Sequence, residues 1–151
     1  MKEIKAPFEL APSVLVLTDF SEASKEALRW AAHTATHRHA NLKVLYPYRL
    51  TQLTGRDDLA QHKRNIEIEA KNSFSKLAES VFKDTPTQYD FKAEVGFIND
   101  RVYSYTRTDE ILLVVISKKM ANTNKEALNE LLDHLRAPLL IVPHNEVDNN
   151  K

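Results

Sequence analysis

The chain has 151 residues, 42% of them hydrophobic, and its 21 basic residues balance 21 acidic ones. This length suits one globular domain, and the balanced charge gives no overall field that would hold the protein on nucleic acid or an anionic membrane. The absence of cysteine excludes disulfides, thiolate metal sites and cysteine nucleophiles. No apolar run is long enough to span a bilayer, and the first residues lack the apolar core of a secretory signal, so we expect a cytoplasmic protein.

A strand and a helix are predicted within the first forty residues. The continuous apolar run from Ser13 to Leu17 is typical of a central strand that helices cover on both faces. Residues 18–21 then turn the chain into a helix, for which Ser21 is the expected N-cap. The small-residue stripe of this helix is Leu28, Ala31, Ala32 and Ala35. Trp30 lies off the stripe, so we expect it under a neighbouring loop or at a contact surface.

The second strand and the second helix follow in the same order. The strand is predicted from Leu42 to Tyr48 and is ended by Pro47, with Gly55 in the polar loop after it. A long helix runs from about Asp57 to Phe82. Its apolar stripe is Leu59, Ile66, Ala70, Phe74, Leu77 and Val81.

A third strand and a short helix lead to the most apolar part of the chain. Alternating apolar and polar residues from Tyr89 to Val95 predict a half-buried edge strand, ended by Gly96. The helix is expected from Asn99 to about Arg107, and the run from Ile111 to Ile116 is expected to be a central strand. The inward residues of the helix are Val102, Tyr105 and Thr106.

The last helix and the last strand complete the pattern. The helix is predicted to begin near Thr123, whose spacing to Glu126 fits a capping box. The strand runs from Leu139 to Val142 between two prolines. Five strands thus alternate with four helices, which predicts a three-layer α/β/α domain with a mostly parallel sheet. We assign residues 1–12 to an N-terminal extension, 13–143 to the domain and 144–151 to a disordered polar tail.

Both ends of this pattern resemble the universal stress protein family. The N-terminal match is VLVLTDFSEAS, residues 14–24, followed by small residues on the first helix, and the C-terminal match is APLLIVP, residues 137–143. The resemblance implies a five-stranded parallel sheet of order 3-2-1-4-5, in the Rossmann-like fold of the adenine nucleotide alpha hydrolases. It also implies a ligand crevice where strands one and four diverge, since that is the topological switch point.

Many members of this family bind ATP, and the chain keeps only part of the pattern that the resemblance implies. Asp19 matches the family's aspartate after the first strand. The family's phosphate motif is a glycine, two residues, a second glycine, nine residues, then glycine and Ser or Thr, directly after strand four. Here residues 117–126 contain no glycine, and Ser117 and Met120 stand at the first two glycine positions. We therefore expect a degenerate nucleotide site and no cofactor.

The physical chemistry of helix ends supports that expectation. A helix N-terminus binds phosphate only where its amides are free, and the capping box predicted at Thr123 would satisfy one and place the Glu126 carboxylate there. Lys118 and Lys119 act in the opposite direction, because two cations beside the crevice could hold an anion. The alternative is therefore an adenine-nucleotide (ATP or AMP) sensor. Its candidate ligand residues are Asp19, Tyr46, Ser117, Lys118 and Lys119.

Asp19 and Tyr46 also allow interpretations without a ligand. An aspartate between a strand and a helix can accept hydrogen bonds from the backbone of its own turn. Tyr46 and Tyr48 could stack on a base, or they could cover the second layer as rim residues.

No catalytic or metal site is predicted. His33 and His37 have a metal-ligand spacing, but they lie opposite the buried stripe of their helix, so we interpret them as surface residues. Ser21 lacks a nucleophile elbow, and no histidine stands at a recognised spacing from it, so we do not expect an enzyme.

The last strand argues for a partner. It is apolar on both faces although the topology places it at an edge, and exposed apolar edges pair. The resemblance implies dimerisation through this strand, about a two-fold axis. The expected interface residues are Leu139, Leu140, Ile141 and Val142. We thus expect a non-enzymatic stress-response or regulatory protein that acts through dimerisation and protein contacts.

Overall fold

The structure is a computed structural model that describes residues 11–50 and 58–144. The predictions for Gly55, for a helix start at Asp57, for most of the N-terminal extension and for all of the polar tail except His144 lie outside these residues.

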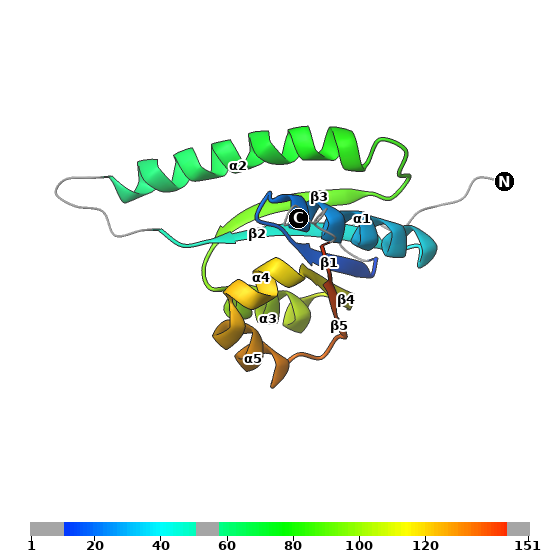
Figure 1. Cartoon of the computed structure of the whole chain (residues 1–151). Coiled ribbons are helices and arrows are strands. Elements are labelled where there is room, and N and C mark those ends of the chain that lie inside the picture. The colour runs from blue at the N-terminus through cyan, green and yellow to red at the C-terminus, as the bar shows by residue number, and fades with distance from the viewer. Residues whose placement is uncertain (1–10, 51–57, 145–151) are drawn as a thin grey trace, which may run out of the picture.

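Five parallel strands form one sheet of order β3-β2-β1-β4-β5, which confirms the sheet expected from the resemblance (Figure 1). The strands are β1 (Ser13–Leu17), β2 (Asn41–Tyr48), β3 (Tyr89–Val95), β4 (Ile111–Ser117) and β5 (Leu139–Val142).

Pro47 lies inside β2 and does not end it, contrary to the sequence prediction. The N–H of Asn41 donates to the carbonyl of Pro12, so the odd-numbered amides of β2 face β1. The proton that Pro47 lacks would therefore point to the side where β1 has already ended at Leu17. The strand loses no ladder bond there, which is why proline is tolerated.

Five helices are present among the described residues, one more than the sequence predicted. They are α1 (Glu22–His37), α2 (Leu59–Val81), α3 (Ile98–Thr108), α4 (Lys118–Thr123) and α5 (Lys125–Leu132). The predicted cap of the first helix is confirmed, since Ser21 Oγ accepts from the N–H of Ser24 at 3.2 Å. The single helix expected after β4 is wrong, because α4 begins directly after that strand.

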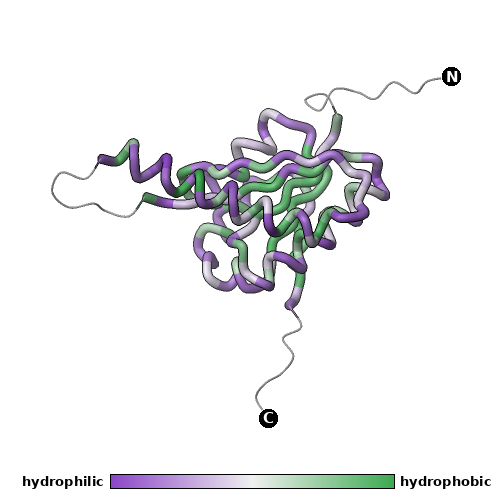
Figure 2. The backbone as a smooth tube through the Cα atoms, turned by 90° about the horizontal axis from the view of Figure 1, so that it is seen from above, coloured by the Kyte–Doolittle hydropathy of each residue, from purple (hydrophilic) through white to green (hydrophobic). Residues whose placement is uncertain are grey.

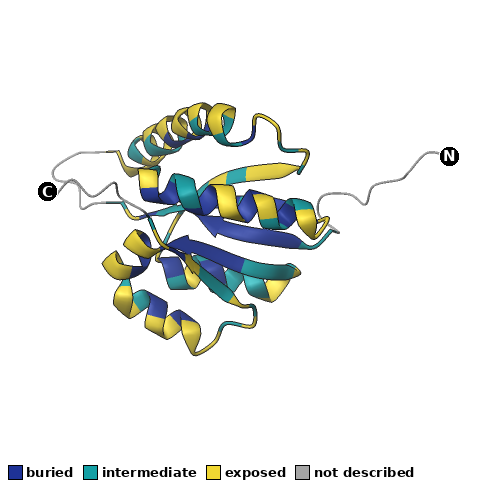
Figure 3. Cartoon of the chain, turned by 45° about the vertical axis from the view of Figure 1, so that its right-hand side comes forward, coloured by how far each residue is buried: buried dark blue, intermediate teal, exposed yellow. Residues whose placement is uncertain are grey.

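The helices cover both faces of the sheet, with the buried strands between them (Figure 3). Val14 and Val16 of β1 pack with residues of α1 and α2. Leu15 and Leu17 point the other way and pack with residues of α3, α4 and α5. The strands form the apolar centre of the molecule (Figure 2), which confirms the three-layer α/β/α prediction.

The predicted helical stripes differ in how much they bury. All four stripe residues of α1 are buried, whereas in α2 only Ala70 and Phe74 are buried and Leu59 is 53% exposed. The N-terminal half of α2 extends past the sheet and has little to pack on (Figures 1 and 2). Trp30 on α1 is 52% exposed, so of its two expected places no described loop covers it, and a contact surface stays a prediction.

Candidate functional site

Asp19 follows β1 directly, and its carboxylate organises the turn into α1. Its Oδ1 accepts hydrogen bonds from the N–H of Ser21 at 3.0 Å, from Ser21 Oγ and from Ser24 Oγ. Partial burial raises the pKa of Asp19. The hydrogen bonds from both serines and the charge of Lys119 lower it by more, so the pKa lies below its ordinary value. Asp19 is therefore ionised at neutral pH, and it has the turn-forming role that the sequence allowed.

Phe20, in the turn between β1 and α1, has a left-handed backbone at φ +64°. Such a conformation costs a non-glycine residue about 1–2 kcal/mol. The N–H of Phe20 donates to Thr18 Oγ1 at 3.0 Å, and its ring lies 4.8 Å from the Tyr46 ring. These contacts hold the strained residue in place.

Tyr46 and Tyr48 both lie toward α2. Their rings are 5.8 Å apart, and the Tyr48 hydroxyl donates to Glu67 Oε2 of α2 at 2.6 Å. Burial, together with the bond to Glu67, raises the pKa of Tyr48 well above its ordinary value. Tyr48 thus covers the second layer and also lines the pocket described below, so neither of the two interpretations is excluded.

The turn after β4 is capped by Ser117, not by Thr123. Ser117 is fully buried, and its Oγ accepts from the N–H of Met120 at 3.0 Å. Thr123 lies at the end of α4, where its hydroxyl donates to the carbonyl of Lys119 at 2.8 Å. The capping box predicted with Glu126 is therefore wrong. Ser117 offers its cap six residues earlier, and the helix that starts there brings Met120 and Ala121 into the core.

Asn124 separates α4 from α5. Its N–H and its Nδ2 both donate to the carbonyl of Met120, at 3.1 and 2.8 Å, and so end α4. The next helix begins without a side-chain cap and carries Glu126 in its first turn. The Glu126 carboxylate therefore lies at the N-terminus of α5, but it does not cap this helix.

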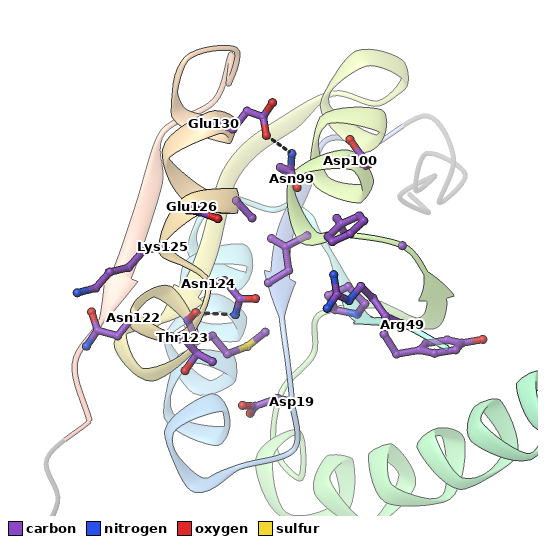
Figure 4. Close-up of a pocket in the computed structure, with 17 residues that line it drawn as sticks. Asp19, Arg49, Asn99, Asp100, Asn122, Thr123, Asn124, Lys125, Glu126 and Glu130 are labelled. Carbon is purple, nitrogen blue, oxygen red and sulfur yellow. Dashed lines mark hydrogen bonds between the residues drawn. The ribbon is translucent and has the colours of Figure 1, made fainter. Parts of the chain in front are cut away.

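A pocket of about 1020 Å³ lies at the carboxyl ends of the strands, between the first turns of α3 and α5 (Figure 4). Asp19 lines it beside Met120, whose side chain is buried with Sδ 3.5 Å from Ser24 Oγ. Gly96 lines the opposite side at φ +143°, and a Cβ there would approach the Arg101 side chain to 3.1 Å. This position therefore requires glycine.

Negative charge exceeds positive charge among the described residues that line the pocket. Its charged residues are Asp19, Asp100, Glu126 and Glu130, with Arg49 and Lys125 as the cations. The guanidinium of Arg49 lies 4.4 Å from the centre of the Phe97 ring, and the Lys125 side chain extends away from Arg49 (Figure 4). Four carboxylates thus face two cations.

Of the five predicted ligand residues, only Asp19 lines the described pocket, and Tyr46 and Lys119 lie near enough to Asp19 to interact with its charge. Tyr46 lies toward α2, Ser117 is fully buried, and Lys118 and Lys119 are exposed outside the described lining. Their ligand role stays a prediction.

Sequence reasoning missed the residues that follow the second and third strands. Arg49 comes directly after β2, and Phe97 comes two residues after β3. The rule that ligands bind beyond the carboxyl ends of parallel strands could have indicated both.

The described residues contain no group of three or more His, Asp or Glu side chains that could hold a metal ion. Among the same residues, no helix is both long and apolar enough to cross a bilayer. His33 and His37 are exposed, as predicted.

The sequence profile described as the universal stress protein family matches residues 12–143. No curated protein gave a significant match. Among solved structures, universal stress protein UspA from Lactobacillus plantarum is similar, with a TM-score of 0.70, 18% identity and coverage of 88% of this chain and 98% of that one.

Two further similar structures were solved with nucleotides. The universal stress protein from Archaeoglobus fulgidus in complex with dAMP has a TM-score of 0.63 and 17% identity, over 89% of this chain and 98% of that one. A universal stress protein in complex with cAMP has a TM-score of 0.60 and 16% identity, over 91% of this chain and 99% of that one. At these identities the likeness shows the fold.

Proposed function

Because the chain belongs to the universal stress protein family, we propose that it is a non-enzymatic regulator that acts through dimerisation and protein contacts and does not bind ATP. The observation that carries this proposal is the charge of the pocket lining, which holds four carboxylates and two cations, an excess that Lys119 beside Asp19 offsets only in part. The triphosphate of ATP brings further negative charge, which Mg²⁺ neutralises only in part, and like charges in a partly enclosed site repel.

The backbone after β4 supports the same proposal. The N–H of Met120 is bonded to Ser117 Oγ, so this amide does not face a ligand. Residues 117–126 contain no glycine, so this segment lacks a residue without a Cβ that would let the backbone approach a phosphate closely. Glu126 adds a carboxylate in the first turn of α5.

The melting temperature of the full chain with and without Mg-ATP tests the proposal. A ligand present at a hundred times its Kd stabilises a protein by about 2.7 kcal/mol. For a chain of this size that stabilisation raises the melting temperature by roughly 5–10 °C. We expect a change below about 1 °C at about 1 mM ATP, and phosphate release no faster than in buffer. A rise in the larger range would contradict the proposal.

A matched pair of variants separates charge from shape. The double variant Glu126→Gln and Glu130→Gln removes two negative charges from the pocket lining and keeps its volume. If repulsion excludes ATP, this variant gains affinity for ATP. The control is the double variant Glu79→Gln and Asp84→Asn, which removes two charges outside the lining. It should leave the affinity for ATP unchanged.

The alternative is a sensor of an adenine mononucleotide. Asp19 remains at the strand end and lines the pocket, and similar proteins were solved with dAMP and with cAMP. A monophosphate adds less negative charge than ATP does. AMP and cAMP therefore belong in the same melting series, where a rise with either and none with ATP would favour this alternative.

Dimerisation through β5 is part of the proposal. Among the described residues, this strand pairs with β4 on one edge and with no strand on the other. Leu139 and Leu140 are half-buried, and Ile141 is 42% exposed. A second copy paired along the open edge would cover this apolar surface.

A further inference from the structure

His33 and His37 form a pair of exposed imidazoles on α1, on a different surface from the pocket. Their ring centres lie 4.2 Å apart. The spacing of four residues places them one helical turn apart on one face. Two such nitrogens can reach a single ion, since metal-to-imidazole bonds are about 2.0–2.1 Å long.

The ring of His37 is already oriented for such a role. Its Nδ1 lies 3.1 Å from the carbonyl oxygen of His33. The carbonyl can only accept, so Nδ1 carries the proton and Nε2 keeps its lone pair for a ligand bond. Metal-binding histidines usually donate their second ring nitrogen to an oxygen in this way, which fixes the tautomer and the ring orientation.

The two arginines nearest to the histidine pair in sequence, Arg29 and Arg38, do not prevent a cation from binding there. Arg29 lies one turn before His33, but its guanidinium pairs with Glu26 at 3.2 Å. Arg38 follows the helix as its C-cap residue, and the negative end of the helix dipole lies at the same place. Neither arginine contributes a ligand, so two imidazoles are the donors that α1 offers.

We propose that His33 and His37 bind one divalent transition-metal ion of the kind that prefers imidazole, such as Ni²⁺, Cu²⁺ or Zn²⁺. Water or a donor atom from a partner completes its coordination. This site revises, at one place, the expectation that the chain holds no metal. It agrees with the absence of any group of three ligating side chains among the described residues, because it uses two.

Trp30 gives this site a built-in reporter. It is the only tryptophan of the chain, it is 52% exposed, and it lies three residues before His33 and seven before His37. These spacings place all three side chains on one face of α1. Paramagnetic Ni²⁺ or Cu²⁺ bound there would quench its fluorescence, whereas Zn²⁺ would compete with them without quenching.

The test is a titration of the untagged full chain with NiCl₂ at neutral pH, followed by Trp30 fluorescence. We expect saturable quenching that EDTA reverses and that Zn²⁺ shifts to higher Ni²⁺ concentration. Cu²⁺ should reach half-saturation at a lower concentration than Ni²⁺, in the order expected for nitrogen ligands. Linear quenching without saturation, equal to that of free tryptophan, would overturn the proposal.

Single variants assign the ligands. His33→Gln and His37→Gln should each raise the half-saturation concentration at least about tenfold, which corresponds to about 1.4 kcal/mol of binding free energy. His62→Gln, on α2, is the matched control and should leave it unchanged. Both ligand positions are exposed, so circular dichroism should show an unchanged fold. An unchanged half-saturation concentration in either ligand variant, or a raised one in the control, would refute the two-histidine site.

Discussion

At the scale of single residues, Ser117 and Thr123 show how a local motif can mislead. The spacing from Thr123 to Glu126 fits a capping box, but spacing says nothing about which hydroxyl lies nearer the end of the strand. Ser117 is the last residue of β4 and caps the next turn itself. A sequence pattern cannot choose between two candidate caps six residues apart, because the choice depends on which helix start buries Met120.

The two residues should therefore respond differently to alanine. Ser117→Ala leaves the N–H of Met120 without its acceptor and should lower the free energy of unfolding by about 0.5–2 kcal/mol. Thr123→Ala should change it by less than about 0.5 kcal/mol, as for an ordinary surface position. Urea unfolding at constant m-value measures both. A larger loss of unfolding free energy in Thr123→Ala than in Ser117→Ala would instead support the capping box at Thr123.

Asp19 is expected to stabilise its turn through both its acceptor oxygen and its charge. Asp19→Ala leaves the buried Ser24 hydroxyl without its carboxylate acceptor and should cost about 1–3 kcal/mol at neutral pH. Asp19→Asn keeps an oxygen in that place and should cost less.

The acid limb of the stability curve separates these two contributions. Because the folded pKa of Asp19 lies below its ordinary value of 3.8, the charge contributes stability at pH values above 3.8. That contribution is lost as the pH falls through the folded pKa. Urea unfolding as a function of pH should therefore show the wild type and Asp19→Asn converging below about pH 4. A gap that stays constant down to pH 2 would mean that the charge plays no part.

At the scale of elements, two tyrosine hydroxyls connect the helices to the sheet. Tyr48 of β2 bonds Glu67 of α2, and Tyr105 of α3 bonds Glu94 of β3 at 2.9 Å. Burial and these carboxylate partners raise the pKa of both tyrosines above the ordinary value of 10.0. Each bond depends on a protonated hydroxyl, so both connections are sensitive to alkaline pH.

Alkaline pH should therefore weaken the fold through these tyrosines. A group whose folded pKa is raised contributes stability that is fully present below its unfolded pKa and lost as the pH rises through the folded value. The free energy of unfolding should fall above pH 10, and Tyr48→Phe and Tyr105→Phe should each reduce the fall. Urea unfolding between pH 8 and 11 measures it. If the unfolding free energy fell with pH as steeply in both variants as in the wild type, the fall could not be assigned to these two tyrosines.

The strands could be predicted from sequence more accurately than the helix ends. The apolar runs from Ser13 to Leu17 and from Leu139 to Val142 match β1 and β5 at both ends. All of β1 is buried, which favours a continuous apolar run, and two prolines bound β5. The break between α4 and α5 could not be predicted, since it depends on Asn124 bonding back to Met120 through the folded turn. The apolar stripe of α2 was predicted to be buried, and this was wrong for Leu59, where the helix extends past the sheet.

At the scale of the whole molecule, the sheet order was available only through the family resemblance. The periodicity of the sequence predicts the helices and strands but not which strands are neighbours. The two core clusters, one on each face of β1, form only when β4 lies beside β1. The pocket residues Arg49 and Phe97 were not predicted for the same reason. They meet because strands that are distant in sequence end at one edge of the sheet.

The proposed dimer makes a prediction at this scale. Ile141→Lys places a charge on the open edge of β5 and should convert a dimer into a monomer of 17.3 kDa in light scattering after gel filtration. Ile68→Lys on α2, at a position 52% exposed, is the matched control and should leave the mass of the wild type unchanged. A wild type at the monomer mass, or an Ile141→Lys dimer, would exclude the β5 interface.

The central property proposed for this protein is that its pocket does not bind ATP. Isothermal titration calorimetry of Mg-ATP into the purified full chain measures this directly. The charge of the pocket and the Ser117 cap predict heats equal to those of dilution up to about 1 mM ATP, and thus a dissociation constant weaker than about 1 mM, or less than about 4.1 kcal/mol of binding free energy. A one-site isotherm with a dissociation constant below about 10 µM, abolished by Asp19→Ala, would contradict it.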